Sequence, residues 1–175
     1  MKTTGVIRRI DDLGRIVIPK EIRRNLKIRD GESMEIFVDN EYIALKKYSC
    51  LDDLVNISNE LVESISNEFK KNVFITDMNK IIAWSGNDKK TYYDKNISSF
   101  IYNKIVERKK ISIINEKIQL IEGKDVTCNC LIFPIIANGD VKGSISIMSE
   151  DKSITISEEQ IIKVVSKFLG KQVEE

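Results

Sequence analysis

Hydrophobic and polar positions alternate in short runs along the first 47 residues, and turn-forming residues separate these runs. Alternation with a period of two, in segments rich in β-branched side chains, is typical of half-buried strands. The pattern predicts four strands, at residues 5–10, 15–18, 34–38 and 42–46. Asp11-Asp12-Leu13-Gly14 and Asp39-Asn40 supply the turns of two hairpins. Between the hairpins, Pro19 marks the start of a short helix over residues 20–27, because proline is tolerated in the first turn of a helix.

After residue 50 the pattern changes to longer segments. Apolar residues between Leu51 and Lys71 recur at helical spacing, which predicts a helix whose apolar stripe packs on the second half of the chain or on a second subunit. Further helices are predicted over residues 97–109 and from Ser157, a capping serine three residues before a glutamine. Strands are predicted at 73–76, 80–84, 117–121, 128–137 and 141–148, with Asn138-Gly139 as the turn of the last hairpin. The order predicts an α+β fold, an antiparallel sheet with helices on one face.

The predicted helix over residues 20–27 has one basic face and one apolar face. At about 100° per residue, its basic residues fall on one stripe, while Ile22 and Leu26 fall on the other side. The basic residues are Lys20, Arg23, Arg24 and Lys27. Like charges four residues apart destabilise an isolated helix by about 0.2–0.5 kcal/mol per pair. The stripe is therefore either a solvated surface or the binding face for an anionic partner.

Positive charge is concentrated at this end of the chain. Residues 1–29 contain nine basic and three acidic residues, a net charge of +6, whereas the whole chain of 175 residues carries only +1. Arg8 and Arg9 precede the first turn and Arg15 follows it, so the hairpin tip is expected near the basic helix face. Arginines clustered on a short frame are typical of proteins that bind the nucleic-acid backbone. The candidate DNA-binding residues are Arg8, Arg9, Arg15, Lys20, Arg23 and Arg24.

The composition excludes several kinds of site. The chain contains no histidine, which removes His-based catalytic triads and the usual zinc sites. We interpret the three cysteines, Cys50, Cys128 and Cys130, as structural, because their spacing fits neither a disulfide framework nor a metal site. Without a nucleophile–base pair or a glycine-rich phosphate loop, we predict no enzyme, no metal and no cofactor. No signal peptide and no apolar run of about 20 residues is present, so we expect a cytoplasmic protein without a membrane partner.

The first 47 residues resemble a known family of DNA-binding domains. The run GVIRRIDDLGRIVIPKEIRRNLKIRDGESMEIFVDNEYIALKK is similar to the AbrB-type, looped-hinge domain, and GRIVIPKEIRRNL is its most specific part. The longer chain, with a sensor-like second half, is similar to the SpoVT branch of that family. The resemblance implies a domain-swapped homodimeric β-barrel in which arginines matching Arg8, Arg15, Arg23 and Arg24 contact double-stranded DNA. It also implies a nucleoid-associated transcription regulator of sporulation-stage genes.

The second half resembles a GAF domain, most specifically in FPIIANGDVKGSISIMS and in its flanking helices. Such domains often bind small molecules between the sheet and its loops, although many serve only for dimerisation. The resemblance therefore implies an unknown small-molecule effector or an oligomerisation module. Trp84, Cys130 and Phe133 are the candidate pocket residues, with a core or rim position as the alternative for Trp84 and a structural position for Cys130.

These expectations divide the chain into three parts. Residues 1–50 form the predicted DNA-binding and dimerisation domain, residues 51–71 a stiff linker helix, and residues 72–175 a GAF-like sensor or oligomerisation domain packed with that helix. We expect a dimer through the first part, and a tetramer through the C-terminal half stays open. The alternative function is an antitoxin or a DNA-binding interaction protein without a ligand, because AbrB-type folds also occur as antitoxins.

Overall fold

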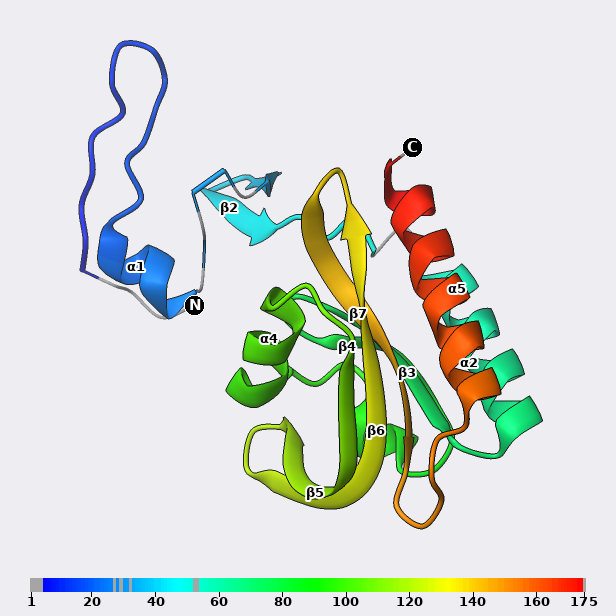
Figure 1. Cartoon of the computed structure of the whole chain (residues 1–175). Coiled ribbons are helices and arrows are strands. Elements are labelled where there is room, and N and C mark those ends of the chain that lie inside the picture. The colour runs from blue at the N-terminus through cyan, green and yellow to red at the C-terminus, as the bar shows by residue number, and fades with distance from the viewer. Residues whose placement is uncertain (1–4, 27, 29, 32, 52–53, 175) are drawn as a thin grey trace. The chain divides into compact units, whose positions relative to one another are not determined.

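The computed structural model in Figure 1 describes residues 5–26, 28, 30–31, 33–51 and 54–174. Its contacts separate the chain into two units, Met1–Tyr48 and Ser49–Glu175, called the first and the second unit below. The first unit contains α1 (Lys20–Asn25) and a hairpin of β1 (Met34–Asp39) and β2 (Tyr42–Lys47). The second unit combines a sheet with helices, and the chain thus has the mixed α+β composition that the sequence predicts.

The segment before α1 differs from the prediction. Within the described residues 5–18, a turn forms at residues 12–14, but the two strands predicted beside it are absent. The main chain bonds across the loop at its tip, where Asp11 N donates to Arg15 O and Gly14 N donates to Asp11 O. A strand needs a neighbour that satisfies its N–H and C=O groups along its length. The described residues of a single copy supply no such neighbour for this segment.

The β1–β2 hairpin forms where the alternation predicts it, with Val38 opposite Ile43 and Ile36 opposite Leu45. These two pairs share one face of the hairpin, because residues two apart along a strand point the same way. The four residues are 80%, 63%, 65% and 47% exposed, in that order. No described residue in the range 5–48 is buried. In a single copy, the first unit therefore has an apolar surface in place of a core.

The second unit is built on one antiparallel sheet with the strand order β4-β3-β7-β6-β5. The strands are β3 (Asn72–Asp77), β4 (Ile81–Ser85), β5 (Ile111–Ile121), β6 (Lys124–Ala137) and β7 (Asp140–Ser149). Asn138 and Gly139, both with positive φ, make the turn between β6 and β7, as predicted. β5 begins at Ile111, whereas the prediction began at residue 117. The first part of the strand was not predicted because a bulge near Asn115, which has a φ of 49°, interrupts the alternation of apolar and polar residues.

Helices cover both faces of this sheet, whereas the sequence predicted them on one face (Figure 1). α2 (Val55–Phe69) and α5 (Ile156–Glu174) share a core with one face of the sheet. α3 (Lys89–Tyr92) and α4 (Ser99–Val106) share a second core with the opposite face. Every residue of β3 is buried, so that strand contributes to both cores. The sequence signal was the continuous apolar run Val73–Ile75, which is consistent with a strand buried on both faces.

α2 forms within the predicted helix over residues 51–71, of which residues 52–53 lie outside the described residues. It ends at Phe69, after which Lys70 takes a left-handed conformation with a φ of 52°. Val62 and Ile65 are buried in the core shared with the sheet. The apolar stripe therefore packs on the second half of the chain, which is one of the two arrangements that the sequence predicted.

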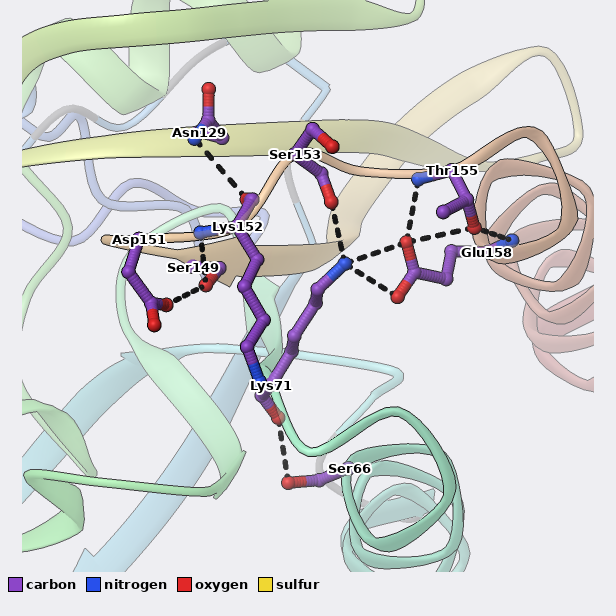
Figure 2. A network of polar contacts seen from close by, with 9 residues as sticks. All are labelled: Ser66, Lys71, Asn129, Ser149, Asp151, Lys152, Ser153, Thr155 and Glu158. Carbon is purple, nitrogen blue, oxygen red and sulfur yellow. Dashed lines mark hydrogen bonds and ion pairs between the residues drawn. The ribbon is translucent and has the colours of Figure 1, made fainter.

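A buried ion pair links the segment after α2 to the start of α5 (Figure 2). Lys71 Nζ lies 2.6 Å from Glu158 Oε1 and 2.7 Å from Glu158 Oε2, and it also donates to Ser153 O at 2.7 Å. Both charged side chains are only 5% exposed. The ammonium group thus has three acceptors, which is the condition for burying a charge without a large loss of stability.

The same carboxylate caps α5. Glu158 Oε2 accepts hydrogen bonds from the Thr155 N–H at 2.6 Å and from the Thr155 hydroxyl at 2.9 Å. Thr155 Oγ1 accepts one from Glu158 N at 3.3 Å. This reciprocal arrangement is a capping box. The predicted cap, Ser157 with Gln160, is wrong by two residues. Thr155 and Glu158 have the same spacing of three residues, and the ion pair with Lys71 holds Glu158 in the capping position.

Candidate nucleic-acid interface

One carboxylate organises the tip of the N-terminal loop. Asp11 Oδ1 accepts hydrogen bonds from the backbone N–H groups of Leu13 at 3.1 Å and Arg15 at 2.7 Å. Asp11 Oδ2 accepts from Arg15 Nε at 2.8 Å and forms an ion pair with it. The hydrogen bond from the Arg15 backbone, followed by that from its side chain, lowers the pKa of Asp11 below its ordinary value. Gly14 completes the turn with a φ of 75°, a conformation that favours glycine.

Arg8 and Arg9 lie on the limb of the loop that precedes the tip, and both are exposed. Arg8 Nη1 donates to Ile7 O at 3.3 Å. Strand geometry would send these two neighbouring side chains to opposite faces, but the described residues here form no strand. Both arginines therefore remain candidates.

α1 carries the other three candidates. Pro19 lies at the N-cap and Leu26 at the C-cap, so the helix is shorter than the predicted range 20–27. Lys20 and Arg24 are exposed. The fourth residue of the predicted basic stripe, Lys27, lies outside the described residues.

Arg23 is more constrained than its neighbours on α1. Its side chain is 37% exposed, and Nη1 forms an ion pair with Asp30. Its Nε atom is buried, and no hydrogen-bond partner for it exists among the residues that the structure describes. The Arg23 guanidinium is thus held by a carboxylate, as the Arg15 guanidinium is.

The structure does not bring the loop tip next to the helix within one copy. Figure 1 shows the loop extending away from α1, so the tip at residues 11–15 lies at the far end of the loop from the helix. The expected proximity of the tip to the basic helix face is therefore wrong for a single chain. The cationic side chains are spread along the N-terminal loop and α1 and do not form one patch.

The three candidate pocket residues do not converge. Trp84 and Cys130 lie in the core under α3 and α4, whereas Phe133 lies in the core under α2 and α5, on the opposite face of the sheet. Trp84 is fully buried and stacks on Phe74 and Tyr92, with ring centroids 5.0 Å and 4.5 Å apart. Its Nε1 donates to Asn87 O at 2.8 Å. Trp84 is therefore a core residue, and these three side chains do not line one pocket.

Cys128 and Cys130 are buried on the same face as Trp84. Burial raises the pKa of Cys128 to about 11 and the pKa of Cys130 well above its ordinary value. Both thiols are therefore neutral at neutral pH, which agrees with the structural interpretation of these two cysteines. Over the described residues, no group of three or more His, Cys, Asp or Glu side chains is placed to hold a metal ion. None of the described helices is both long and apolar enough to cross a membrane.

Comparison with known proteins identifies the family. Residues 53–174 match the family model described as "Stage V sporulation protein T C-terminal, transcription factor". The whole chain is 40% identical, over 178 aligned residues and 100% of both chains, to stage V sporulation protein T of Bacillus subtilis (strain 168). The chain belongs to the stage V sporulation protein T family. Members of this family are described as transcription factors.

In this member of the stage V sporulation protein T family, the first unit has relatives of its own. Residues 7–49 match a family model described as "Antidote-toxin recognition MazE, bacterial antitoxin". A stretch of 48 residues is 56% identical to the transition state regulatory protein AbrB of B. subtilis (strain 168), covering 27% of this chain and 50% of that protein. The AbrB-type resemblance of the N-terminal run is thereby confirmed.

The second unit has the fold of a GAF domain. The GAF domain of an Acinetobacter phosphoenolpyruvate-protein phosphotransferase superposes with a TM-score of 0.59 at 11% identity, covering 69% of this chain and 81% of that chain. A likeness at such low identity concerns the fold alone. The GAF-like architecture predicted for the second half is confirmed.

Sequence reasoning selected the arginines but not the carboxylates that hold two of them. For Asp11 a local signal existed, because an aspartate followed three residues later by glycine is typical of a side chain that closes its own turn. For Asp30 no such signal existed. It lies seven residues after Arg23 and beyond the end of α1, where helical spacing no longer applies.

Proposed function

We propose that this chain is a DNA-binding transcription regulator that controls sporulation-stage genes at the nucleoid. The observation that carries the proposal is the set of cationic side chains presented by the first unit between residues 8 and 24. These are Arg8, Arg9, Arg15, Lys20, Arg23 and Arg24. Residues after position 50 carry seventeen basic and nineteen acidic residues, a net charge of −2, and so do not attract phosphates. The names of the relatives, a sporulation protein and a transition state regulatory protein, support the same function.

We infer that a second copy completes the first unit as a domain-swapped dimeric β-barrel. The support is the exposed apolar face of β1 and β2 together with the lack of any buried residue among the described residues 5–48. Chains near or below about 40–60 residues bury little surface and commonly need disulfides, a metal or oligomerisation to be stable. A second copy would offer the segments 5–10 and 15–18 the neighbouring strands that a single copy lacks, which is the usual basis of domain swapping.

The dimer proposal predicts that Val38→Asp in the full-length chain halves the number of subunits in the assembly. Val38 is 80% exposed in one copy and belongs to the apolar face that the second copy would cover. Burying an unpaired carboxylate costs at least several kcal/mol, so association through this face should be lost at micromolar concentration. Native mass spectrometry or sedimentation velocity measures the assembly size directly.

Asn40→Asp is the matched control for Val38→Asp. It adds the same charge to the same hairpin, but at the turn, where Asn40 follows the last residue of β1 and is exposed. We expect Asn40→Asp to leave the assembly unchanged. An unchanged assembly for Val38→Asp would contradict the dimer interface.

We propose a division of labour along the chain. Residues 1–50 bind DNA and dimerise, residues 51–71 couple the two halves, and residues 72–175 sense an effector or oligomerise. The outer face of α5 supports a tetramer, since three apolar residues at helical spacing are 39%, 65% and 42% exposed. They are Ile161, Val164 and Phe168. A small-molecule effector would regulate only by binding one arrangement of the assembly more tightly than another.

An antitoxin is the second candidate function, because residues 7–49 match the MazE model. Antitoxins of this fold usually carry a short, partly disordered toxin-binding tail, whereas here the folded unit Ser49–Glu175 follows. That unit favours the regulator. We also propose that the chain has no catalytic activity, since its full-length relative belongs to a family of transcription factors.

Selection of bound duplexes from a random pool by the full-length protein tests the proposed function. α1 has only six residues and offers few side chains that could read base edges. We therefore expect enriched duplexes to share bendable or unusually shaped steps and not one long invariant motif. A long invariant motif would indicate ordinary major-groove reading. No enrichment of duplex DNA at low salt would overturn the proposal.

A further inference from the structure

We propose that Asp11 is a positioning residue for DNA binding, whose carboxylate holds the Arg15 guanidinium by its Nε so that the two Nη groups face an acceptor on the duplex. The inference rests on the proposed DNA-binding function of the first unit. It assigns a binding role to an acidic residue within a basic interface, where charge alone would predict that a carboxylate opposes DNA.

Backbone hydrogen bonds hold the Asp11 carboxylate independently of the Arg15 side chain. Its Oδ1 atom accepts from two backbone N–H groups, those of Leu13 and Arg15, so the turn itself sets the orientation of the carboxylate. An ordinary exposed ion pair contributes little, because two long side chains must both be ordered to form it. Here only the Arg15 side chain remains to be ordered, and its bond to Asp11 Oδ2 at 2.8 Å does so.

The remaining donors of Arg15 fit a phosphate or a guanine edge. Arginine has five N–H donors, one on Nε and four on the two Nη atoms, and the Nη groups bind such acceptors in pairs. Asp11 contacts Nε, and among the described residues no hydrogen bond or ion pair of the Nη atoms exists. The Arg15 side chain is still 69% exposed, so the fork stays accessible. Asp11 thus orders Arg15 without covering the groups that would bind DNA.

Asp12 supplies a control that differs from Asp11 in geometry and not in charge. It is the next residue, it is exposed, and its side chain makes no hydrogen bond or ion pair with any described residue. Asp11→Asn and Asp12→Asn each remove one negative charge from the same loop. Their difference therefore isolates the positioning of Arg15 from the effect of charge on a polyanionic ligand.

The experiment measures the affinity and the salt slope of the full-length protein for one duplex chosen by selection and for a mixed-sequence duplex of the same length. Ordering one long side chain changes affinity about two- to tenfold, and a dimer carries two copies, so Asp11→Asn should bind at least about fivefold more weakly than Asp12→Asn. If Asp11→Asn loses affinity for both duplexes, Arg15 contacts a phosphate. If it loses affinity only for the selected duplex, Arg15 contacts a base edge. In an Arg15→Ala background the two asparagine variants should bind equally, because Asp11 then has no guanidinium to hold.

Arg15→Lys keeps the inference testable if Asp11→Asn alters the loop fold. Lysine keeps the charge but has a single ammonium group, which cannot bond Asp11 and also present a fork. We expect Arg15→Lys to retain the salt slope and to lose affinity as Asp11→Asn does. The inference would be overturned if Asp11→Asn and Asp12→Asn bound DNA with equal affinity, or if Arg15→Lys bound DNA as tightly as the native protein. Either result would leave the proposed DNA binding intact. A native protein that binds neither duplex would instead refute the proposed function.

Discussion

Replacing Lys71 by methionine should lower the free energy of unfolding of the second unit by about 3–5 kcal/mol, because it leaves the Glu158 carboxylate buried without its counter-charge. Lys71 and Glu158 are both 5% exposed, so water cannot replace the lost partner without rearrangement (Figure 2). The measurement is urea denaturation of the full-length protein. Trp84 is the only tryptophan of the chain and is fully buried in the second unit, so its fluorescence follows this transition.

The destabilisation by Lys71→Met should depend on pH. In the native protein burial by itself would raise the pKa of Glu158, but the hydrogen bonds from Lys71 and Thr155 outweigh it, and the pKa is lowered. Such a carboxyl adds stability above its unfolded pKa and loses it as pH falls. Without Lys71 we expect the effect of burial to dominate and the folded pKa to rise above the unfolded value. The gap between native and variant stability should then be small in acid and widen as pH rises through the glutamate range, from about pH 4 to about pH 7.

Lys110→Met is the matched control for Lys71→Met. Lys110 pairs with Glu159, the next residue on α5, at 2.8 Å, but the two side chains are 45% and 36% exposed. Exposed pairs contribute about 0–1 kcal/mol, so this variant should unfold almost as the native protein does. Equal denaturation midpoints for the two variants would show that the buried pair does not hold α5 to the end of α2.

Affinity for duplex DNA should fall about 10³- to 10⁵-fold between about 50 and 200 mM salt, as expected for proteins that make six to ten phosphate contacts. A dimer offering Arg8, Arg15, Arg23 and Arg24 from each copy makes a number of contacts within that range. Each phosphate contributes a slope of about −0.9 in a plot of log K against log salt concentration. Arg24→Ala removes one exposed cation per copy and should flatten the slope by about 1.8. Fluorescence anisotropy of a labelled duplex provides the measurement.

Lys109→Ala is the control for the salt experiment. Lys109 is exposed in the second unit, so its loss changes the net charge by the same amount away from the proposed interface. We expect the slope of Lys109→Ala to equal that of the native protein. A native affinity that barely changes with salt would contradict phosphate binding by the arginines.

The sequence pattern predicted an element correctly where the alternation and turn residues of that segment alone were enough to identify it. β1, β2 and β7 lie within one residue of the predicted strands at 34–38, 42–46 and 141–148. Alternation and turn residues are sufficient for these elements, because each strand and the turn beside it are specified by residues that are neighbours in the sequence. The arginines of the candidate interface were likewise selected by charge clustering alone, and the AbrB-type resemblance added which of them to expect on DNA.

Pattern failed where structure depends on a distant or absent partner. Lys71 and Glu158 are 87 residues apart, and no local rule pairs them. The strands predicted at 5–10 and 15–18 need neighbours that one copy does not supply in its described residues. A helix was predicted over residues 97–109, where α4 lies, but its place on a second face of the sheet was not, because the short apolar run Val73–Ile75 does not by itself identify a strand buried on both faces. Phe133 was grouped with Trp84 and Cys130, although residues three apart on one strand face opposite ways.

If the open apolar face of β1 and β2 is covered by a second copy, as proposed, the supply of active regulator depends on gene dosage. If DNA is bound only by a dimer, then well below the dissociation constant a doubling of synthesis raises the amount of dimer about fourfold. If second units pair first and the connection between the units lets the two first units reach each other, they meet at a raised effective concentration, about millimolar when such a connection is short and flexible. The protein concentration needed to occupy the DNA sites would then be lower. The second unit could thus set the timing of a developmental switch through protein copy number, even without an effector.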